Sequence, residues 1–388
     1  MAKHDFRSRW WFELIRRGES AIAWSRRASS AFARPAVLIA VFLVLVPVCI
    51  LLIRPAVHAS GTTWYVSTTG NNGNDCLSAG TACLTIGGAI SKAAAGDTID
   101  VAAGTYNEQV VVPSSLTLNG AQQGVDARTR SGSESIVTNT CGPFQIEADN
   151  VTVNGFTIEG ATSTSNGCFY VGVWTNPGFS GTHGGTQILN NIIQNNISGI
   201  ELDNDGTYQT KVQYNLIQNN NNSGPGPGDG IETNFGLANA LIDNNEFVGQ
   251  TNESVVVEAV SSNFTISNNM LDAGIALFDS STISISGNMS FGDTAEDATI
   301  DLAGGDSGVS VTGNALLNGS EAIVVEDPYS VGANSSITVN SNCISNNAIA
   351  GLAVATGSYS GGAGSLDATN NWWGAASGPN YNSGGPGS

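Results

Sequence analysis

The stretch Thr265-Ile266-Ser267-Asn268-Asn269-Met270-Leu271 decides the fold, because its pattern returns along the second half of the chain. An aliphatic residue usually stands three positions before the asparagine, and an apolar residue usually stands two positions after it. The steps between successive asparagines are 24, 30, 24, 19, 26, 28 and 29 residues. A repeat of about 20 to 50 residues that varies through insertions is typical of a solenoid. The eight asparagines are Asn191, Asn215, Asn245, Asn269, Asn288, Asn314, Asn342 and Asn371.

The segments around these asparagines have the period of β-strands rather than of helices. Residues 151–156 and 284–288 alternate apolar and polar side chains, and Gly, Asn, Ser and Asp between such segments favour turns. A further short strand is predicted in most coils, as at 199–202, 230–232 and 274–277. Stacked coils would pair each strand with its equivalents about 4.8 Å above and below. The sequence therefore predicts an all-β solenoid.

The repeated asparagines are interpreted as structural. Each is expected at a sharp bend between two strands, where asparagine tolerates left-handed backbone. Stacked side-chain amides can also hydrogen-bond along a column and satisfy polar groups that would otherwise be buried without partners. We therefore expect an asparagine ladder and no catalytic role for these residues.

Both ends of the repeat region resemble a known family. Residues 64–67, 96–99 and 104–106 resemble the opening of secreted bacterial right-handed parallel β-helix proteins of the pectin-lyase-like superfamily, and 370–374 resembles their last coil. The resemblance implies a right-handed parallel β-helix of about ten or eleven coils over 60–373, roughly 50 Å long. It implies no single activity, because the superfamily includes lyases, hydrolases, epimerases and proteins without known reaction.

The N-terminal end of the solenoid needs a cover, since its open core would face water. Residues 85–95 carry apolar side chains at helical spacing and predict a short amphipathic capping helix.

The first 60 residues have a different composition. Residues 1–35 are basic and residues 36–53 contain no charge, which predicts a cytoplasmic N-terminus followed by a signal-peptide core or a transmembrane anchor. Small residues before Ser60 favour cleavage after Ala59, and a retained anchor is the alternative. In either case the repeats are expected to be secreted or at the cell surface, ending in a flexible Gly/Ser/Pro/Asn-rich tail over 374–388.

The exported part is strongly acidic. After Ser60 there are 29 acidic residues and four basic ones, a net charge of about −25. This balance argues against nucleic acid as a partner. It favours either simple solubility or the binding of a divalent cation such as Ca²⁺. We expect a monomer.

Five cysteines follow Ser60, which suits an oxidising compartment. Cys76 and Cys83 flank a short loop and are predicted to form a local disulfide. Cys141 and Cys168 are 27 residues apart, about one coil, so a bond between neighbouring coils is expected. Cys343 is left as a lone thiol in the wall.

Acidic residues recur on the strand that follows each asparagine bend. Aligned strands place Glu201, Glu232 and Asp301 at one outward position. Carboxylates on successive coils would lie about 5 Å apart at the backbone, where they raise one another's pKa or recruit a cation. The next outward position is predicted to hold Asp203, Asn234, Glu258 and Glu326.

Two enzymatic functions fit this face. A polysaccharide lyase needs carboxylate-bound Ca²⁺ and a basic residue that removes a proton, and these strands lack Arg and Lys. A glycoside hydrolase needs a pair of carboxyl groups, for which Glu201, Asp203 and Glu232 are the candidates. The Asp-Asp and Gly-His-Gly signatures of the family's polygalacturonases are absent, and His183 lies in a predicted loop.

The third function is a rod that contacts a polysaccharide or cell-surface glycan without a reaction. Candidate ligand-binding residues are Glu258, Asp301 and Glu326, and aromatic side chains are available for stacking on sugars. Carbohydrate contact at the cell surface is the role that the sequence favours, with a lyase or hydrolase as the alternative. The aromatic candidates are Tyr170, Trp174 and Phe278.

Overall fold

The computed structural model describes residues 61–176, 183–224, 228–292, 298–362 and 365–379. Over these ranges the chain is almost entirely β-structure arranged in three parallel sheets. The predictions for residues 1–35, for the segment 36–53, for cleavage after Ala59 and for the end of the tail lie outside the described residues. Within the described ranges, no helix combines the length and the apolar character that a membrane crossing requires.

Sheet A contains eleven strands and sheets B and C contain ten each. Sheet A comprises β1 (Thr63–Val66), β2 (Thr98–Val101), β5 (Thr117–Asn119), β8 (Thr152–Asn154), β11 (Gln187–Leu189), β14 (Asn204–Gln213), β17 (Leu237–Asp243), β20 (Ser261–Ser267), β23 (Ser280–Ser286), β26 (Ser307–Thr312) and β29 (Thr338–Asn340).

Sheets B and C have the same stacking order as sheet A. Sheet B comprises β3 (Gly104–Asn107), β6 (Ser135–Thr138), β9 (Phe156–Glu159), β12 (Ile192–Gln194), β15 (Leu216–Gln218), β18 (Glu246–Val248), β21 (Met270–Leu271), β24 (Met289–Phe291), β27 (Ala315–Leu317) and β30 (Cys343–Ser345). Sheet C comprises β4 (Val110–Val112), β7 (Phe144–Ile146), β10 (Val171–Trp174), β13 (Ser198–Glu201), β16 (Ile231–Thr233), β19 (Glu253–Val257), β22 (Gly274–Leu277), β25 (Ala298–Leu302), β28 (Glu321–Val325) and β31 (Ala353–Val354).

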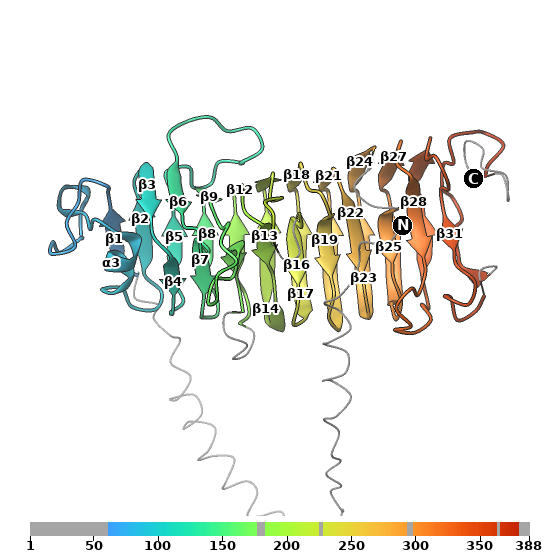
Figure 1. Ribbon diagram of the computed structural model, residues 1–388, viewed down its shortest axis with the longest axis horizontal. Coiled ribbons are helices and arrows are strands. Elements are labelled where there is room, and N and C mark those ends of the chain that lie inside the picture. Colours follow the sequence, from blue (N-terminus) through green and yellow to red (C-terminus); the bar gives the residue numbers. More distant parts are fainter. Residues whose placement is uncertain (1–60, 177–182, 225–227, 293–297, 363–364, 380–388) are drawn as a thin grey trace, which may run out of the picture. The chain divides into compact units, whose positions relative to one another are not determined.

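Each coil passes through sheets A, B and C in turn, and the next coil pairs with it in parallel register. The coils stack in chain order from β1 to β31 (Figure 1). Side chains that point inward form one continuous apolar core along the stack; sheet A supplies Ile188, Val212, Ile242 and Ile266 to it, all almost fully buried. The predicted parallel β solenoid is confirmed.

The repeated asparagines form a ladder at the bend between sheets A and B. The Asn269 backbone N–H and side-chain Nδ2 both donate to Oδ1 of Asn288, at 3.0 Å each. Its Nδ2 also donates to the carbonyl of Ile242 on the preceding coil. The same pattern connects the ladder from its first member to its last: Asn191, Asn215, Asn245, Asn269, Asn288, Asn314, Asn342 and Asn371.

The expectation that these asparagines themselves adopt left-handed backbone is wrong. The positive φ belongs to the residue before each of them, as at Asn190 (54°), Asn244 (56°) and Asn268 (54°). The bend therefore needs left-handed backbone one position earlier, whereas the ladder position needs an amide that can both donate and accept. This division explains why two asparagines so often stand side by side.

A second polar column lies five residues after the first, at the bend between sheets B and C. Asn196 accepts from the Ala161 backbone N–H through Oδ1, and its own N–H donates to Oδ1 of Asn220. Gln250 occupies the corresponding place on the next coil and donates to the Ile217 carbonyl. Sequence reasoning missed this column, although the constant offset of five residues from the main ladder was a signal for it.

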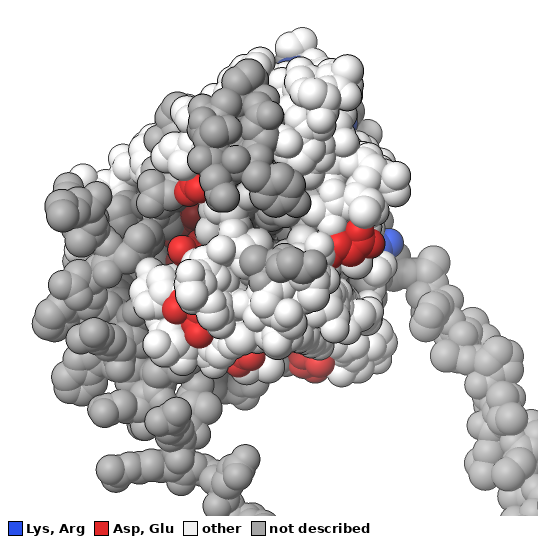
Figure 2. Space-filling view, turned by 90° about the vertical axis from the view of Figure 1, so that its right-hand side faces the viewer, with Lys and Arg blue, Asp and Glu red and all other residues white. Residues whose placement is uncertain are grey.

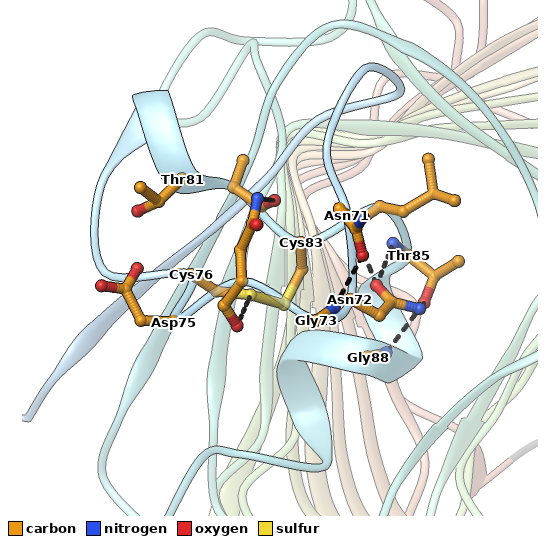
Figure 3. Close-up of a disulfide and its surroundings, with 12 residues drawn as sticks. Asn71, Asn72, Gly73, Asp75, Cys76, Thr81, Cys83, Thr85 and Gly88 are labelled. Carbon is orange, nitrogen blue, oxygen red and sulfur yellow. Dashed lines mark hydrogen bonds between the residues drawn. A yellow bond between two sulfur atoms is a disulfide. The ribbon is translucent and has the colours of Figure 1, made fainter.

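The N-terminal region contains the short helix α3 (Ile86–Ile90) and the 3₁₀ turn η1 (Ala79–Thr81). Helix α3 is shorter than the predicted 85–95, because the chain leaves helical geometry at a bend after Ser91. The Ile86 side chain of this helix packs into the core. At the helix start, the Thr85 hydroxyl accepts a hydrogen bond from the Gly88 backbone N–H. Figure 3 shows this cap beside the nearby disulfide.

Both predicted disulfides are present. Cys76 bonds to Cys83, and beside this bond the Asn72 side chain donates to the Thr85 hydroxyl and accepts from the Leu84 N–H (Figure 3). Cys141 bonds to Cys168, which joins neighbouring coils. Cys343 carries a free thiol and is exposed, as expected for the unpaired cysteine.

The long segment that contains Arg130 is tied to the wall of the solenoid. The Arg130 guanidinium is fully buried, forms an ion pair with Glu134 at 2.8 Å, and donates to the Phe156 and Asn190 carbonyls. Through these hydrogen bonds, the Arg130 side chain attaches the segment between β5 and β6 to two coils.

Candidate functional site

The outward face of sheet C carries the predicted acidic column. In strand β13, Ile200 faces the core, so its neighbour Glu201 faces outward, because side chains alternate along a strand. Glu201 pairs directly with Glu232 on the next coil. The column continues through Val256 and Ala276 to Asp301. The structure therefore brings Glu201 and Glu232 together and places Asp301 three coils further on.

This part of the outward face is recessed. Glu201 and Glu232 are only 5% and 9% exposed, and Val256 and Ala276 beside them are also buried. The sequence predicted that these carboxylates lie on an outward face, and the structure buries the two at Glu201 and Glu232. Buried carboxylates lose hydration, which disfavours their charged form.

Glu201 is a carboxyl group poised to hold a proton near neutrality. Burial, together with the nearby charge of Asp203, raises the pKa of Glu201 to about 7. The Asn234 side chain partly opposes this rise in pKa. Trp174 lies directly beside Glu201 in the paired strands β10 and β13. A carboxyl group with this pKa can donate a proton at neutral pH and can accept one again.

Asp203 lies two residues beyond Glu201 and is fully buried. Burial raises the pKa of Asp203 to about 6, although backbone N–H groups and the Asn176 side chain favour its ionised form. One of these donors is the Phe235 N–H, which lies 2.8 Å from Oδ1. At neutral pH Asp203 is therefore more ionised than Glu201.

Glu232 is the most strongly perturbed of the three. Burial raises its pKa well above the usual range, and the charges of surrounding carboxylates raise the pKa further. These neighbours come from three coils, so the acidic cluster is a product of stacking. The contributing residues are Asp229, Glu201, Glu258 and Asp203.

Several buried polar atoms of this cluster lack partners. Oδ2 of Asp203, Oε1 of Glu232 and Oδ1 of Asn176 are inaccessible and accept no hydrogen bond. The indole Nε1 of Trp174 is likewise buried without a partner at hydrogen-bond distance. Buried unpaired groups are costly for stability and are commonly retained for function. We name Glu201, Asp203, Glu232, Asn176 and Trp174 the acidic cluster.

The other predicted residues lie away from this cluster or at its edge. Glu258 and Asn234 are exposed, and Glu258 is close enough to influence Glu232. Asp301 and Glu326 are half-buried on later coils. Among the described residues, no set of three or more His, Cys, Asp or Glu side chains is arranged to hold a metal ion. His183 lies 3.6 Å from Asp149, outside the cluster.

Two residues of the site had no sequence signal of their own. Asn176 and Asp229 stand in connections next to strands β10 and β16, where the repeat pattern says nothing about side-chain direction. Stacking of the coils brings Asn176 toward Asp203, whereas Asp229 acts on Glu232 from three residues earlier on the same coil.

Aromatic side chains lie at two places on or beside this face. Trp174 packs against Phe169 with ring centroids 4.7 Å apart. Phe278, after β22, packs against the exposed Tyr329 with centroids 5.7 Å apart. Seen from the β31 end, the described surface shows several acidic patches and few Lys or Arg atoms (Figure 2).

The comparisons with known proteins support the fold. No family model matches the sequence. No curated protein is significantly similar to it. Among solved structures, Dettilon tailspike protein (gp208) is 17% identical with a TM-score of 0.53, over 75% of this chain and 64% of that one. The chain thus spans less than two thirds of that tailspike.

Two further structures resemble the chain. The GH136 lacto-N-biosidase from Eubacterium ramulus is 11% identical with a TM-score of 0.50, over 80% of this chain and 67% of that one. Pectate lyase Pel9A is 13% identical with a TM-score of 0.49, over 80% of each chain. At these identities a likeness concerns architecture alone. Together with the three parallel sheets, the likeness to the tailspike and the lacto-N-biosidase identifies the fold as a right-handed parallel β-helix.

Proposed function

We propose that this protein binds a glycan along the outward face of sheet C and hydrolyses a glycosidic bond at the acidic cluster. The observation that carries the proposal is the in-register pair Glu201 and Glu232 with Asp203 beside it, all three buried, with an unpaired oxygen on Glu232 and another on Asp203. The fold-level likeness to a lacto-N-biosidase and to a tailspike is consistent with a carbohydrate ligand.

Hydrolysis needs one carboxyl group that donates a proton and another that acts as a base or nucleophile. Glu201, whose pKa is about 7, suits the proton donor to the leaving oxygen. Asp203, whose pKa is about 6 and which accepts from the Phe235 N–H, suits the ionised partner. Glu232 pairs in register with Glu201 and supplies an unpaired Oε1 that would accept a hydrogen bond from the sugar.

Elimination by a lyase is less well supported. It requires a base for the sugar C5 proton and positive charge to neutralise a uronate. The residues that act on Glu232 are all acidic, so a uronate placed there would meet like charges.

The first prediction tests the proton donor. Glu201→Gln should lower kcat by about 10²-fold or more, because the amide cannot donate a proton to the leaving group. Wild-type activity should be bell-shaped in pH, falling below about pH 6 as Asp203 gains a proton and above about pH 7 as Glu201 loses one. New reducing ends from a panel of neutral, amino and uronate polysaccharides provide the measurement.

The matched control is Glu159→Gln, which removes a carboxylate from strand β9 on sheet B. This variant should retain full activity and the circular dichroism spectrum of the wild type. If wild-type protein releases no reducing ends from any glycan, or if Glu201→Gln is as active as wild type, the hydrolysis proposal is wrong.

We further propose that the domain works outside the cytoplasm, as a secreted or surface-held monomer. The basic segment 1–35, the apolar segment 36–53 and the two disulfides support export. Helix α3 has its buried Ile86 and Ala89 against the first coils, which supports a role as the N-terminal cap.

A further inference from the structure

The groups that act on the acidic cluster provide no compensating positive charge. Glu232 is influenced by Asp229 from the preceding turn, by Glu201 and Asp203 from β13, and by Glu258 from the end of β19. The two members of the cluster on the β10 side, Trp174 and Asn176, are uncharged.

Basic residues in the described part of the chain are scarce, and two are engaged elsewhere. Arg128 pairs with Asp126 at 2.6 Å, and Arg130 pairs with Glu134 at 2.8 Å. After Ser60 the chain has only two other basic residues, Lys92 and Lys211. No Lys or Arg is among the groups that shift the pKa of Glu201, Asp203 or Glu232, whose pKa values are all raised.

The unpaired atoms of the cluster specify what a ligand must offer. Three of the four are acceptors: Oδ2 of Asp203, Oε1 of Glu232 and Oδ1 of Asn176. A sugar hydroxyl brings one donor together with two acceptor lone pairs, whereas an ammonium group brings three donors and no acceptor. The ammonium also supplies the missing positive charge.

We propose that the acidic cluster recognises a glycan whose sugars carry free, protonated amino groups. The inference rests on the proposed glycan site and narrows its substrate class to unacetylated amino sugars. An ammonium group next to Glu232 and Asp203 donates to their unpaired oxygens and holds both carboxylates ionised. The surplus of 29 acidic residues over four basic ones after Ser60 attracts such a polycation from a distance.

Cationic and neutral glycans should bind with opposite pH dependence. A cationic ligand favours the ionised carboxylates and releases protons on binding, so its affinity rises with pH. A neutral ligand only removes water from the carboxyl groups, which favours their protonated form. Its affinity therefore rises as pH falls. Each proton released or taken up changes the affinity by up to about tenfold per pH unit.

The experiment compares a hexamer of β-1,4-linked glucosamine with its fully N-acetylated counterpart. Binding is measured by calorimetry between about pH 4.5 and 6, where the free amines remain protonated, using Glu201→Gln so that cleavage does not interfere. The glucosamine hexamer should bind at least tenfold more tightly than the acetylated hexamer at pH 6. Its affinity should rise about three- to tenfold per pH unit and fall with added NaCl.

A second charge deletion locates the effect. In the Glu201→Gln background, Glu232→Gln should weaken binding of the glucosamine hexamer about tenfold or more, and Glu159→Gln should leave it unchanged. Should Glu232→Gln fail to fold, the salt dependence of the Glu201→Gln affinity tests whether charge drives the binding, and an affinity independent of salt overturns the inference.

The outcomes separate this inference from the proposed hydrolysis. Equal or tighter binding of the acetylated hexamer, or no binding of either hexamer, overturns the inference. Cleavage of neutral glycans by wild-type protein that ignores the glucosamine hexamer also overturns it while leaving hydrolysis intact. Tight, salt-sensitive binding of glucosamine hexamer without new reducing ends supports the inference and contradicts the hydrolysis.

Discussion

Asp306 lies in the wall of the solenoid, and the equivalent position on the next coil is occupied by an asparagine, Asn334. Its Oδ1 accepts from the Ser280 N–H at 2.9 Å, and its own N–H donates to Oδ1 of Asn334 at 3.0 Å. The Nδ2 of Asn334 donates to the Leu302 carbonyl, whereas Oδ2 of Asp306, in the corresponding place, is buried without a partner. Burial, with the charge of Asp279 adding to it, raises the pKa of Asp306 to about 7.

The consequence is a pH-dependent contribution to stability. Because the folded state binds this proton more tightly than the unfolded state, whose pKa is near 3.8, the contribution is complete below about pH 4 and is lost as pH rises to about 7. Asp306→Asn restores a donor that does not titrate. The variant should be more stable than wild type at pH 8 by about 1–3 kcal/mol. Urea unfolding at pH 5 and pH 8 provides the measurement, and an equal or lower stability at pH 8 would contradict the protonated-acid interpretation.

The ladder asparagines allow a complementary test. Asn269→Leu removes one amide from the middle of the column and leaves the Asn245 N–H and the Ile242 carbonyl without their partners. The free energy of unfolding should fall by about 1–3 kcal/mol. Asn107→Leu, on the exposed side of β3, is the control and should change stability little. Equal effects of the two substitutions in denaturant titrations would show that the column contributes nothing.

At the scale of strands, the entry into sheet C depends on glycine. Gly172, Gly199 and Gly230 stack on three successive coils, each two residues before Trp174, Glu201 or Glu232. A Cβ atom on Gly199 would overlap the Gly230 carbonyl and would lie 3.2 Å from the Asn220 amide nitrogen. These glycines let neighbouring strands approach closely where the chain turns into the site.

Gly199→Ala should therefore shift β13 and displace Glu201 with it. We expect a loss of about 1–3 kcal/mol in stability from overpacking, with a drop in glycan cleavage larger than the fraction unfolded explains. Gly80→Ala, whose added Cβ meets nothing closer than 3.9 Å, is the control. Wild-type activity in the folded fraction of Gly199→Ala would show that the glycine stack does not position the carboxylates.

The strands were predictable because stacking imposes the same requirement on every coil. The aliphatic residue before each ladder asparagine must fill the core, and Glu201 and Glu232 each directly follow a Gly-Ile pair. The pairing of Glu201 with Glu232 followed from this repetition. The length of helix α3 was overestimated, because the apolar spacing of 85–95 cannot show at which residue the chain leaves the helical conformation.

The burial of the acidic residues was not predictable from the repeats. It depends on connections of unequal length between coils, and their side chains have no repeating pattern. Asp203 was expected on the open outward face, yet it is fully buried and bonded to the Phe235 N–H of the next coil. The raised pKa values of Glu201 and Asp203 follow from that burial.

On the scale of the whole molecule, each coil contacts mainly the coils before and after it, so a coil is a removable unit. Deleting residues 270–288 joins Asn269 to Met289 and removes one strand from each sheet. The product should fold, retain the acidic cluster of β13 and β16, and be shorter by about 4.8 Å. Small-angle scattering and the reducing-end assay measure these results.

An equally long deletion that is out of phase, residues 246–264, is the control. It removes β18 and β19 and joins the ladder residue Asn245 to Thr265 inside the sheet A strand β20, so the coil loses its passage through sheets B and C and the protein should not fold. If both deletions fold equally well, coil phase does not govern the architecture; if both unfold, the coils are not independent units.

The two disulfides make the two ends of the solenoid differ in their resistance to unfolding. Both lie among the first coils, up to Cys168 before β10, and every later strand relies on hydrogen bonds and packing alone. Under mechanical load or protease attack, the chain should therefore peel from its β31 end, coil by coil. This stepwise unfolding would stop at the disulfide between Cys141 and Cys168, because that bond covalently joins two neighbouring coils. The disulfide therefore limits how far the chain can unfold from its β31 end.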